Sequence, residues 1–269
     1  MKIITVINAK GGCGKSTIAM SLAAGLALRG GRVLLMDLDP QAQITQWLSA
    51  GDGIRAEGTL VSAFTGGHSL TDVIQPTGYA NIHFVASAAG LEDLGREISH
   101  TEGYPAMLTQ LLDAEDIGDR FDFLIIDSPN QISPVMENAI FPADAFIIPF
   151  ESTKAVKSYA SIYQLLMNLR PGKDYRLIHV LTNLSRLPGL RRRVLSLMRE
   201  DGITPAASEI RSCGWLAQVD EYGGSIFHFR PRSNGARDME ALVAEVITTL
   251  SSSGPLTAAR PEAPSGAAA

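Results

Sequence analysis

The stretch NAKGGCGKST, residues 8–17, constrains the fold more than any other part of the chain. It follows the apolar run KIITVI and precedes STIAMSLAAGLALRG, in which apolar residues recur at helical spacing. A strand, a glycine-rich turn with a lysine and a helix together form a phosphate cradle, because backbone N–H groups and the helix dipole point at the anion. The sequence therefore predicts a nucleotide-binding strand–loop–helix unit.

The residues of this loop have separate expected roles. The nucleotide-binding set is predicted to be Gly11, Gly12, Cys13, Gly14, Lys15, Ser16 and Thr17. The glycines let the backbone approach the phosphates closely, Lys15 reaches the β- and γ-phosphates, and the Ser16 hydroxyl faces Mg²⁺. Cys13 is interpreted as a small loop side chain rather than a reactive thiol. The standard motif has a glycine five residues before Gly14, where this chain has Ala9, so the loop is a deviant one.

Acidic residues end two other apolar stretches. LLMDLDP contains Asp37 and Asp39, and FLIIDSP contains Asp127 after four apolar residues. Chemistry on Mg·ATP needs carboxylates near the phosphate loop, so Asp127 is expected to hold the Mg²⁺ shell directly or through water. Asp39 is expected to orient the attacking water and to contribute to the metal site. Asp37 stays open between a role in this site and a cap for the helix that starts near Gln41.

Continuous apolar runs alternate with helical segments along the chain. The predicted strands are 2–7, 32–39, 82–87, 121–127, 145–150 and 176–183, and the helices include 16–30, 105–115, 133–141, 155–169, 189–200 and 236–250. Runs without polar alternation are typical of parallel strands covered on both faces. The fold class expected is α/β, a doubly wound, mostly parallel sheet flanked by helices, with ligands at the carboxyl ends of the strands.

Composition limits the other possibilities. The formal net charge is −5, so any contact with nucleic acid must come from a local basic patch. The two cysteines, Cys13 and Cys213, form no CxxC pair, which argues against a disulfide framework or a structural zinc site. A signal peptide and an apolar run of about 18 residues are both lacking, so a cytoplasmic protein without membrane contact is expected. The tail 251–269, rich in Pro, Ala, Ser and Gly, is expected to be disordered beyond an ATPase domain of residues 1–250.

Four stretches together resemble the ParA/MinD family of deviant Walker A ATPases, which are P-loop NTPases. They are KGGCGKST, DLDPQAQITQWL, DFLIIDSP and AFIIPFES, and the DLDPQ element is most similar to the ParA branch. That branch partitions plasmids and chromosomes and positions other cargo. The resemblance implies ATP and Mg²⁺ as cofactors and a homodimer when ATP is bound. It is most specific at 8–17 and 37–41 and weak after residue 185.

The resemblance explains why the loop has two lysines. In dimers of this family the first lysine, here Lys10, crosses to the ATP phosphates of the partner, while Lys15 serves its own nucleotide. The catalytic residues implied are therefore Lys10, Lys15 and Asp39. One departure is Asn130 in DSPN, where the family often has DTPP. Asn183, at the end of the predicted strand 176–183, is expected to contact adenine, with an ordinary turn as the equal alternative.

Related branches are disfavoured by what the sequence lacks. It has no late CxxC of iron–sulfur scaffold ATPases, no terminal membrane helix of MinD-like proteins and no NKxD motif of GTPases. The ParA branch usually binds DNA non-specifically through basic residues of the ATP dimer. The candidates here are Arg186, Arg191, Arg192, Arg193 and Arg211. A solvated helix face remains the alternative for this charge run.

The function expected is that of an ATP-dependent dimerising ATPase that binds DNA non-specifically. It would position or partition a plasmid, a chromosome or a protein compartment such as a carboxysome. Slow hydrolysis, a stimulating cargo-adaptor protein and nucleoid association are implied by the resemblance. The alternative is an ATP-switched regulatory or metabolic ATPase of the same fold that does not bind DNA.

Overall fold

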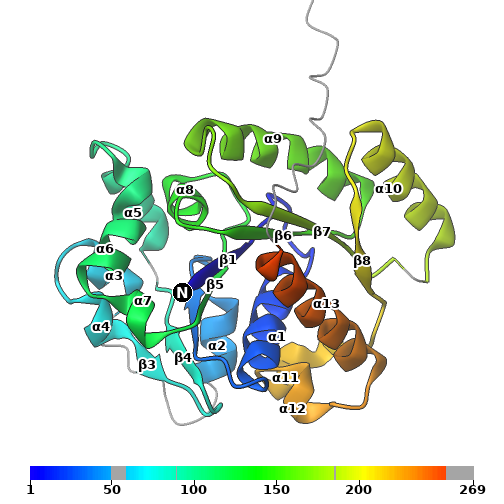
Figure 1. The fold of residues 1–269 in the computed structure, drawn as a ribbon, viewed down its shortest axis with the longest axis horizontal. Helices are drawn as coiled ribbons and strands as arrows, with labels where there is room; N and C mark the ends of the chain where they lie inside the picture. Colours follow the sequence, from blue (N-terminus) through cyan, green and yellow to red (C-terminus); the bar gives the residue numbers. More distant parts are fainter. Residues whose placement is uncertain (50–58, 89, 185, 253–269) are drawn as a thin grey trace, which may run out of the picture.

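The computed structural model describes residues 1–49, 59–88, 90–184 and 186–252. Their strands form one eight-stranded sheet in the order β3-β4-β2-β5-β1-β6-β7-β8 (Figure 1). The strands are β1 (Lys2–Val6), β2 (Val33–Asp37), β3 (Gln75–Pro76), β4 (Ile82–Val85), β5 (Phe123–Asp127), β6 (Ala145–Phe150), β7 (Arg176–Thr182) and β8 (Pro205–Ile210). Within this described sheet β3 pairs antiparallel with β4, and the other neighbours pair in parallel. The predicted doubly wound, mostly parallel sheet is confirmed.

Helices cover both faces of the sheet. They are α1 (Lys15–Ala27), α2 (Gln43–Ser49), α3 (Leu60–Phe64), α4 (Leu70–Val73), α5 (Leu91–Ile98), α6 (Met107–Ala114), α7 (Ile117–Arg120), α8 (Pro134–Ile140), α9 (Thr153–Leu169), α10 (Pro188–Glu200), α11 (Val219–Tyr222), α12 (Ile226–Phe229) and α13 (Asn234–Ser251). Helices α1, α2 and α11 to α13 pack on one face, and α3 to α10 lie on the other (Figure 1). Every residue of β2 and of β6 is buried between these layers, which explains their unbroken apolar sequences.

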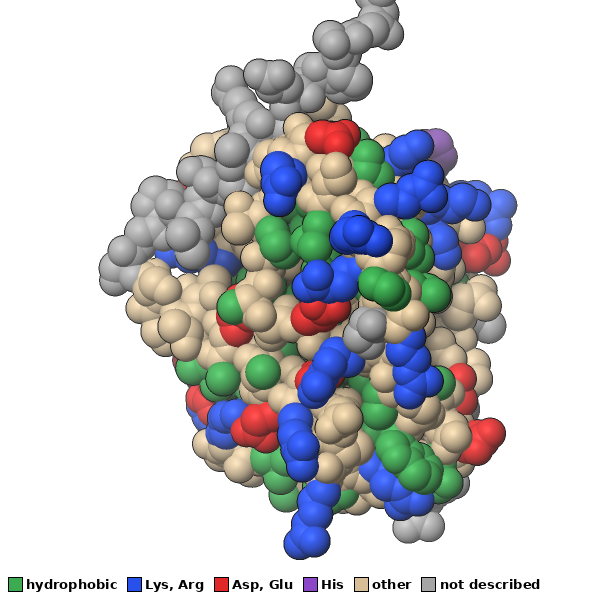
Figure 2. All heavy atoms as spheres, turned by 90° about the vertical axis from the view of Figure 1, so that its right-hand side faces the viewer, with side chains coloured by type: hydrophobic (Ala, Val, Ile, Leu, Met, Phe, Trp, Pro, Cys, Tyr) green, Lys and Arg blue, Asp and Glu red, His purple; other side chains and the backbone are tan. Residues whose placement is uncertain are grey.

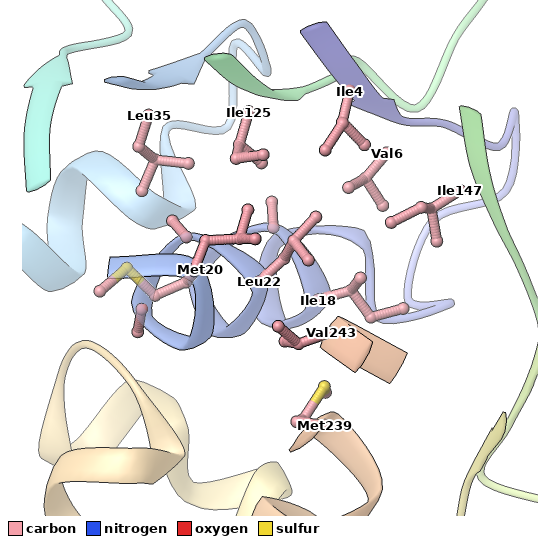
Figure 3. Packing of buried hydrophobic residues seen from close by; sticks show 14 of the residues in the cluster. Ile4, Val6, Ile18, Met20, Leu22, Leu35, Ile125, Ile147, Met239 and Val243 are labelled. Carbon is pink, nitrogen blue, oxygen red and sulfur yellow. The ribbon is translucent and has the colours of Figure 1, made fainter. Parts of the chain in front are cut away.

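Helix α1 lies at the centre of one layer. Its residues 18–27 are all buried, because the sheet covers one side and α13 covers the other. Figure 3 shows Ile18 and Leu22 between the strand residues above them and Val243 of α13 below. A Cβ at Gly25 would lie 2.5 Å from Val243 Cγ2, so these two helices approach more closely than a side chain at this position allows. The helix that follows the phosphate loop is therefore held on both sides.

The parallel register brings the functional loops to one edge. Val6 of β1 pairs with Asp127 of β5, and Asp37 of β2 pairs with the same Asp127. The segments that follow β1, β2, β5, β6 and β7 consequently begin side by side. Of the predicted disordered tail, residues 253–269 lie outside the described part, and Ser251 ends α13. Within the described residues, no helix combines the length and the apolar character that crossing a bilayer requires.

Candidate nucleotide-binding site

The loop between β1 and α1 has the backbone that its glycines predict. Gly12 and Gly14 have φ angles of 75° and 90°, in the left-handed region that favours glycine. A Cβ at either residue would meet no atom within 4 Å, so the space beside them is open to a ligand. The loop is anchored by Cys13, whose carbonyl accepts a hydrogen bond from Thr182 Oγ1 at 3.3 Å. Burial raises the pKa of the Cys13 thiol to about 11, which agrees with its interpretation as a packing residue.

Lys15, Ser16 and Asp127 lie together where α1 meets β5. Lys15 is buried, with 6% of its surface exposed, although it carries a charge. Asp127 is completely buried, and neither of its carboxylate oxygens has a hydrogen-bond partner among the described residues. Burial, reinforced by the charge of Asp37, holds its pKa well above the ordinary value, while the neighbouring Ser16 and Lys15 act against this shift. Both carboxylate oxygens are therefore available to a ligand from outside the polypeptide.

The donor set at this point fits Mg²⁺ bound together with phosphates. Mg²⁺ prefers oxygen ligands and is usually held by one or two carboxylates, with phosphates and water completing the shell. Asp127 supplies an unsatisfied carboxylate, and Ser16 supplies a hydroxyl beside it. The described residues contain no cluster of three or more His, Cys, Asp or Glu side chains arranged for a metal, so a protein-only cage is not part of this site.

Asp37 has a different role from Asp127, its register partner. Its Oδ2 accepts hydrogen bonds from Thr45 N at 2.9 Å and Thr45 Oγ1 at 2.8 Å, and Oδ1 accepts from Asp39 N at 3.1 Å. Burial raises its pKa to about 6 despite these donors. Asp37 therefore fastens the first turn of α2 to the end of β2, as the capping alternative expects.

Asp39 lies in the loop between β2 and α2, 7% exposed. Its Oδ1 accepts from Gln41 N at 3.0 Å, and its carbonyl accepts from Ser87 Oγ at 2.7 Å and Ala42 N at 2.8 Å. These bonds fix the backbone while the described contacts of the carboxylate use only Oδ1. The placement at the carboxyl edge of the sheet suits a water-orienting carboxylate, but no hydrogen bond joins Asp39 to Asp127 in the described residues.

Lys10 is the residue whose surroundings differ most from expectation. The resemblance implies that its side chain crosses to the ATP phosphates of a partner subunit. In the structure, Lys10 Nζ donates a hydrogen bond to Gly11 O at 2.5 Å and lies 3.7 Å from Glu151 Oε1, with 37% of the side chain exposed. Lys10 is thus folded against its own chain by Glu151, a residue that sequence reasoning missed. Its position directly after β6 was the available signal, because the other strand-end acids were found in that way.

A family model described as an AAA domain matches residues 1–176, more than half of the chain. The chromosome-partitioning ATPase Soj of Thermus thermophilus is 29% identical over 262 residues, which cover 91% of this chain and 94% of the relative. The chain belongs to the ParA/MinD family of ATPases. The cell division protein PomZ of Myxococcus xanthus is a further relative, 26% identical over 254 residues, covering 91% of this chain and 77% of PomZ.

Solved structures show the ParA/MinD fold in this chain. Apo McdA of Cyanothece superposes with a TM-score of 0.80 at 21% identity, covering 91% of this chain and 99% of McdA. Cobyrinic acid a,c-diamide synthase from Mycobacterium smegmatis, with a bound ATP analog and magnesium, superposes with a TM-score of 0.77 at 22% identity, covering 92% and 94%. The fold is therefore shared with McdA and with a protein that binds an ATP analog together with magnesium.

In this ParA/MinD chain Asn183 directly follows β7 and has a left-handed conformation, with φ 56°, as residues in turns often do. Its backbone N–H donates to Ile210 O at 2.8 Å and its carbonyl accepts from Ser212 Oγ at 3.0 Å, so both groups are held by β8 and the residues after it. Its side chain is exposed near the loop that Thr182 anchors. The turn alternative accounts for the backbone, and the exposed amide leaves the adenine contact as a prediction.

The five predicted DNA-contacting arginines divide into two groups. Arg191 forms a two-pronged ion pair with Glu209, with Nη2 at 2.8 Å from Oε2, and Arg211 forms one with Asp238, with Nη2 at 2.6 Å from Oδ1. In the described part of the chain no ion pair involves the exposed Arg186, Arg192 or Arg193. Figure 2 shows Lys and Arg side chains gathered over the side of the molecule that carries α10 and β8.

Proposed function

We propose that this chain is an ATP-dependent, dimerising ATPase that binds DNA non-specifically and positions or partitions a cargo. The observation that carries the proposal is the buried, unpartnered carboxylate of Asp127 beside Lys15 and Ser16. A charge in such a position costs stability unless a ligand compensates it. Mg·ATP supplies that compensation, and relatives named as chromosome-partitioning ATPases support the cellular role.

The residues divide the work of hydrolysis. The glycines of the loop and Lys15 bind the phosphates, and Ser16 and Asp127 hold Mg²⁺, which when bound neutralises charge on the β- and γ-phosphates. Asp39 orients the attacking water. Lys10 of one subunit reaches the phosphates of the other, so the site is complete only in the dimer. Hydrolysis is slow until a cargo-adaptor protein stimulates it.

The DNA contact is assigned to the arginines that form no ion pair within the described residues. Arg191 and Arg211 are already neutralised by carboxylates, so their contribution to a phosphate contact requires those pairs to break. Arg186, Arg192 and Arg193 need no such step. Three contacts per subunit amount to about six per dimer, and log K should then fall with log salt at a slope of roughly −5.

The alternative is an ATP-switched regulatory or metabolic ATPase without DNA binding. The ion pairs of Arg191 and Arg211 favour this alternative, because they leave fewer free cations for DNA. The likeness of the fold to that of a diamide synthase also supports it, because the same architecture is found in a protein named as an enzyme of synthesis. Fluorescence anisotropy with non-specific duplex DNA separates the two functions. Binding that requires Mg·ATP, ignores sequence and weakens with salt supports the first function. Absence of binding, or binding equal with ADP and without nucleotide, supports the second.

A further inference from the structure

Lys10 has one acidic partner in the described structure, and that partner is on its own chain. Glu151 follows β6 directly, and its Oε1 lies 3.7 Å from Lys10 Nζ. Oε1 also accepts a hydrogen bond from Ser152 Oγ at 2.9 Å, and Ser152 caps α9 by accepting from Ala155 N. The carboxylate is thereby oriented toward the entrance of the phosphate loop.

The surroundings of Glu151 make it dependent on Lys10. Its side chain is 17% exposed, and Oε2 is buried without a hydrogen-bond partner. Its charge is close enough to Cys13 in the loop to raise the pKa of that thiol, although burial is the larger cause. Glu151 therefore places a negative charge beside the loop that is to receive phosphates. When Lys10 leaves, no other described cation lies within ion-pair distance of this carboxylate.

The backbones around the pair are fixed relative to each other. Asn8, two residues before Lys10, donates from Nδ2 to Pro149 O at 2.9 Å, two residues before Glu151. Asn8 Oδ1 accepts from Ser158 Oγ of α9 at 2.8 Å. The first bond connects the segment after β1 to β6, and the second connects it to α9. Release of Lys10 is consequently a rotation of its side chain rather than a separation of the two strands.

We propose that Glu151 is a positioning residue that retains Lys10 in the resting monomer and sets the threshold for ATP-dependent dimerisation. The inference rests on the proposed dimer, in which Lys10 contacts the phosphates of the partner. Lys10 cannot serve Glu151 and a partner nucleotide together, so each subunit breaks this pair when the dimer forms. Two Lys10–Glu151 pairs break when a symmetric dimer forms. The factor by which their loss changes the dimer dissociation constant is therefore the square of the factor for one pair.

The test is Glu151→Gln, measured by sedimentation equilibrium at saturating Mg²⁺ and ATPγS, where nucleotide affinity no longer affects the result. An exposed or half-buried ion pair corresponds to a factor of roughly two to five per subunit. The dimer of Glu151→Gln should therefore dissociate at roughly 4- to 25-fold lower concentration than wild type. Glu200→Gln on α10 is the matched control, because it removes the same charge where the described partner is Ser196. It should leave the dimer constant unchanged.

A second measurement examines the pair in the monomer. Thermal unfolding of Lys10→Ala, Glu151→Gln and the double variant without nucleotide should give a non-additive cycle. Additive effects overturn the inference, as does an unchanged or weaker dimer in Glu151→Gln. If neither wild type nor Glu151→Gln dimerises, the proposed dimer fails and the inference fails with it. A wild type that dimerises beside an unchanged Glu151→Gln overturns the inference alone.

Discussion

Asp37 and Asp127 are register partners on adjacent parallel strands, and only Asp37 accepts hydrogen bonds from other described residues. Asp37 accepts hydrogen bonds from Thr45 and from the backbone N–H of Asp39, whereas neither carboxylate oxygen of Asp127 has such a partner in the described part of the chain, although Ser16 lies beside it. Two aspartates at equivalent positions, each at the end of a parallel strand, thus have different roles. One holds α2 in place, and the other is left for a ligand.

The same substitution at these two positions should have opposite effects. Asp127→Asn should keep or raise the melting temperature of the nucleotide-free protein, because it removes a buried charge without partners. It should lower magnesium-dependent ATP affinity at least about tenfold, a loss of about 1.4 kcal/mol. Asp37→Asn should destabilise the protein by about 1–3 kcal/mol, since an amide group then faces buried donors. Calorimetry and thermal unfolding of both variants measure this contrast, and equal destabilisation would contradict it.

Asp39→Ala should bind Mg·ATP and fail to hydrolyse it. The phosphate cradle does not include Asp39, while the water-orienting carboxylate is lost. The variant should accumulate as an ATP-bound dimer, visible by light scattering with a parallel phosphate-release assay. Wild-type turnover in this variant would assign the orientation of water to another residue.

Substitution of the two lysines of the loop should have different effects on ATP binding and on dimerisation. Lys15→Ala should lose most of its ATP affinity, because the buried ammonium belongs to the cradle of its own subunit. Lys10→Ala should retain ATP binding by the monomer and lose ATP-dependent dimerisation, and DNA binding with it. Isothermal titration and light scattering measure the two properties separately. A normal dimer in Lys10→Ala would leave Lys10 without a role in trans.

The free and paired arginines should differ in their effect on DNA affinity. Replacing Arg192 and Arg193 by Ala removes up to four cations per dimer and should reduce the salt slope by about 3 to 4. Arg191→Ala should change the slope by less, because Glu209 already neutralises Arg191. Anisotropy titrations at several salt concentrations give both slopes. A larger change in Arg191→Ala would show that Arg191 leaves Glu209 to bind DNA.

His179 should make the folded state sensitive to mild acid. Its Nδ1 lies 3.0 Å from Thr204 O and its Nε2 lies 3.0 Å from Tyr159 Oη, so the neutral ring donates from Nδ1 and accepts at Nε2. Burial lowers the pKa of His179 from 6.5 to about 4. A lowered pKa means that stability is complete above pH 6.5 and is lost as pH falls toward 4. The loss at pH 5 should approach about 2 kcal/mol, measured by urea unfolding, and His179→Gln should show a smaller difference between pH 7 and pH 5.

The central strands of the sheet were predictable because both of their faces are buried. β8 was not predicted, since PAASEI is an edge strand with small and polar residues that pack against α13 on one side. β3 has only two residues and pairs at the opposite edge. Sequence patterns report burial, and edge strands are not buried enough to show it.

The residues of the site were likewise predictable only where a local sequence pattern marks them. The phosphate loop and the acids at strand ends were found locally, because each lies next to an apolar run. Asp37 differs from Asp127 because the hydroxyl of Thr45, in α2, donates a hydrogen bond to it at the end of β2. Likewise, Lys10 meets Glu151 across 141 positions, and Glu209 lies 18 positions from Arg191. Partners at such separations leave no mark in local spacing.

Helix α1 has no exposed face between residues 18 and 27, and α13 approaches it at Gly25 too closely for a side chain. A helix enclosed in this way cannot tilt or slide when a nucleotide arrives without disturbing the whole core. Information about the bound nucleotide must therefore leave the site through the segments that follow β1, β2 and β5, where Lys10, Asp39 and Asn130 lie. The phosphate loop and α1 thus form a rigid base, and we expect the response to the nucleotide to occur in the loops around it.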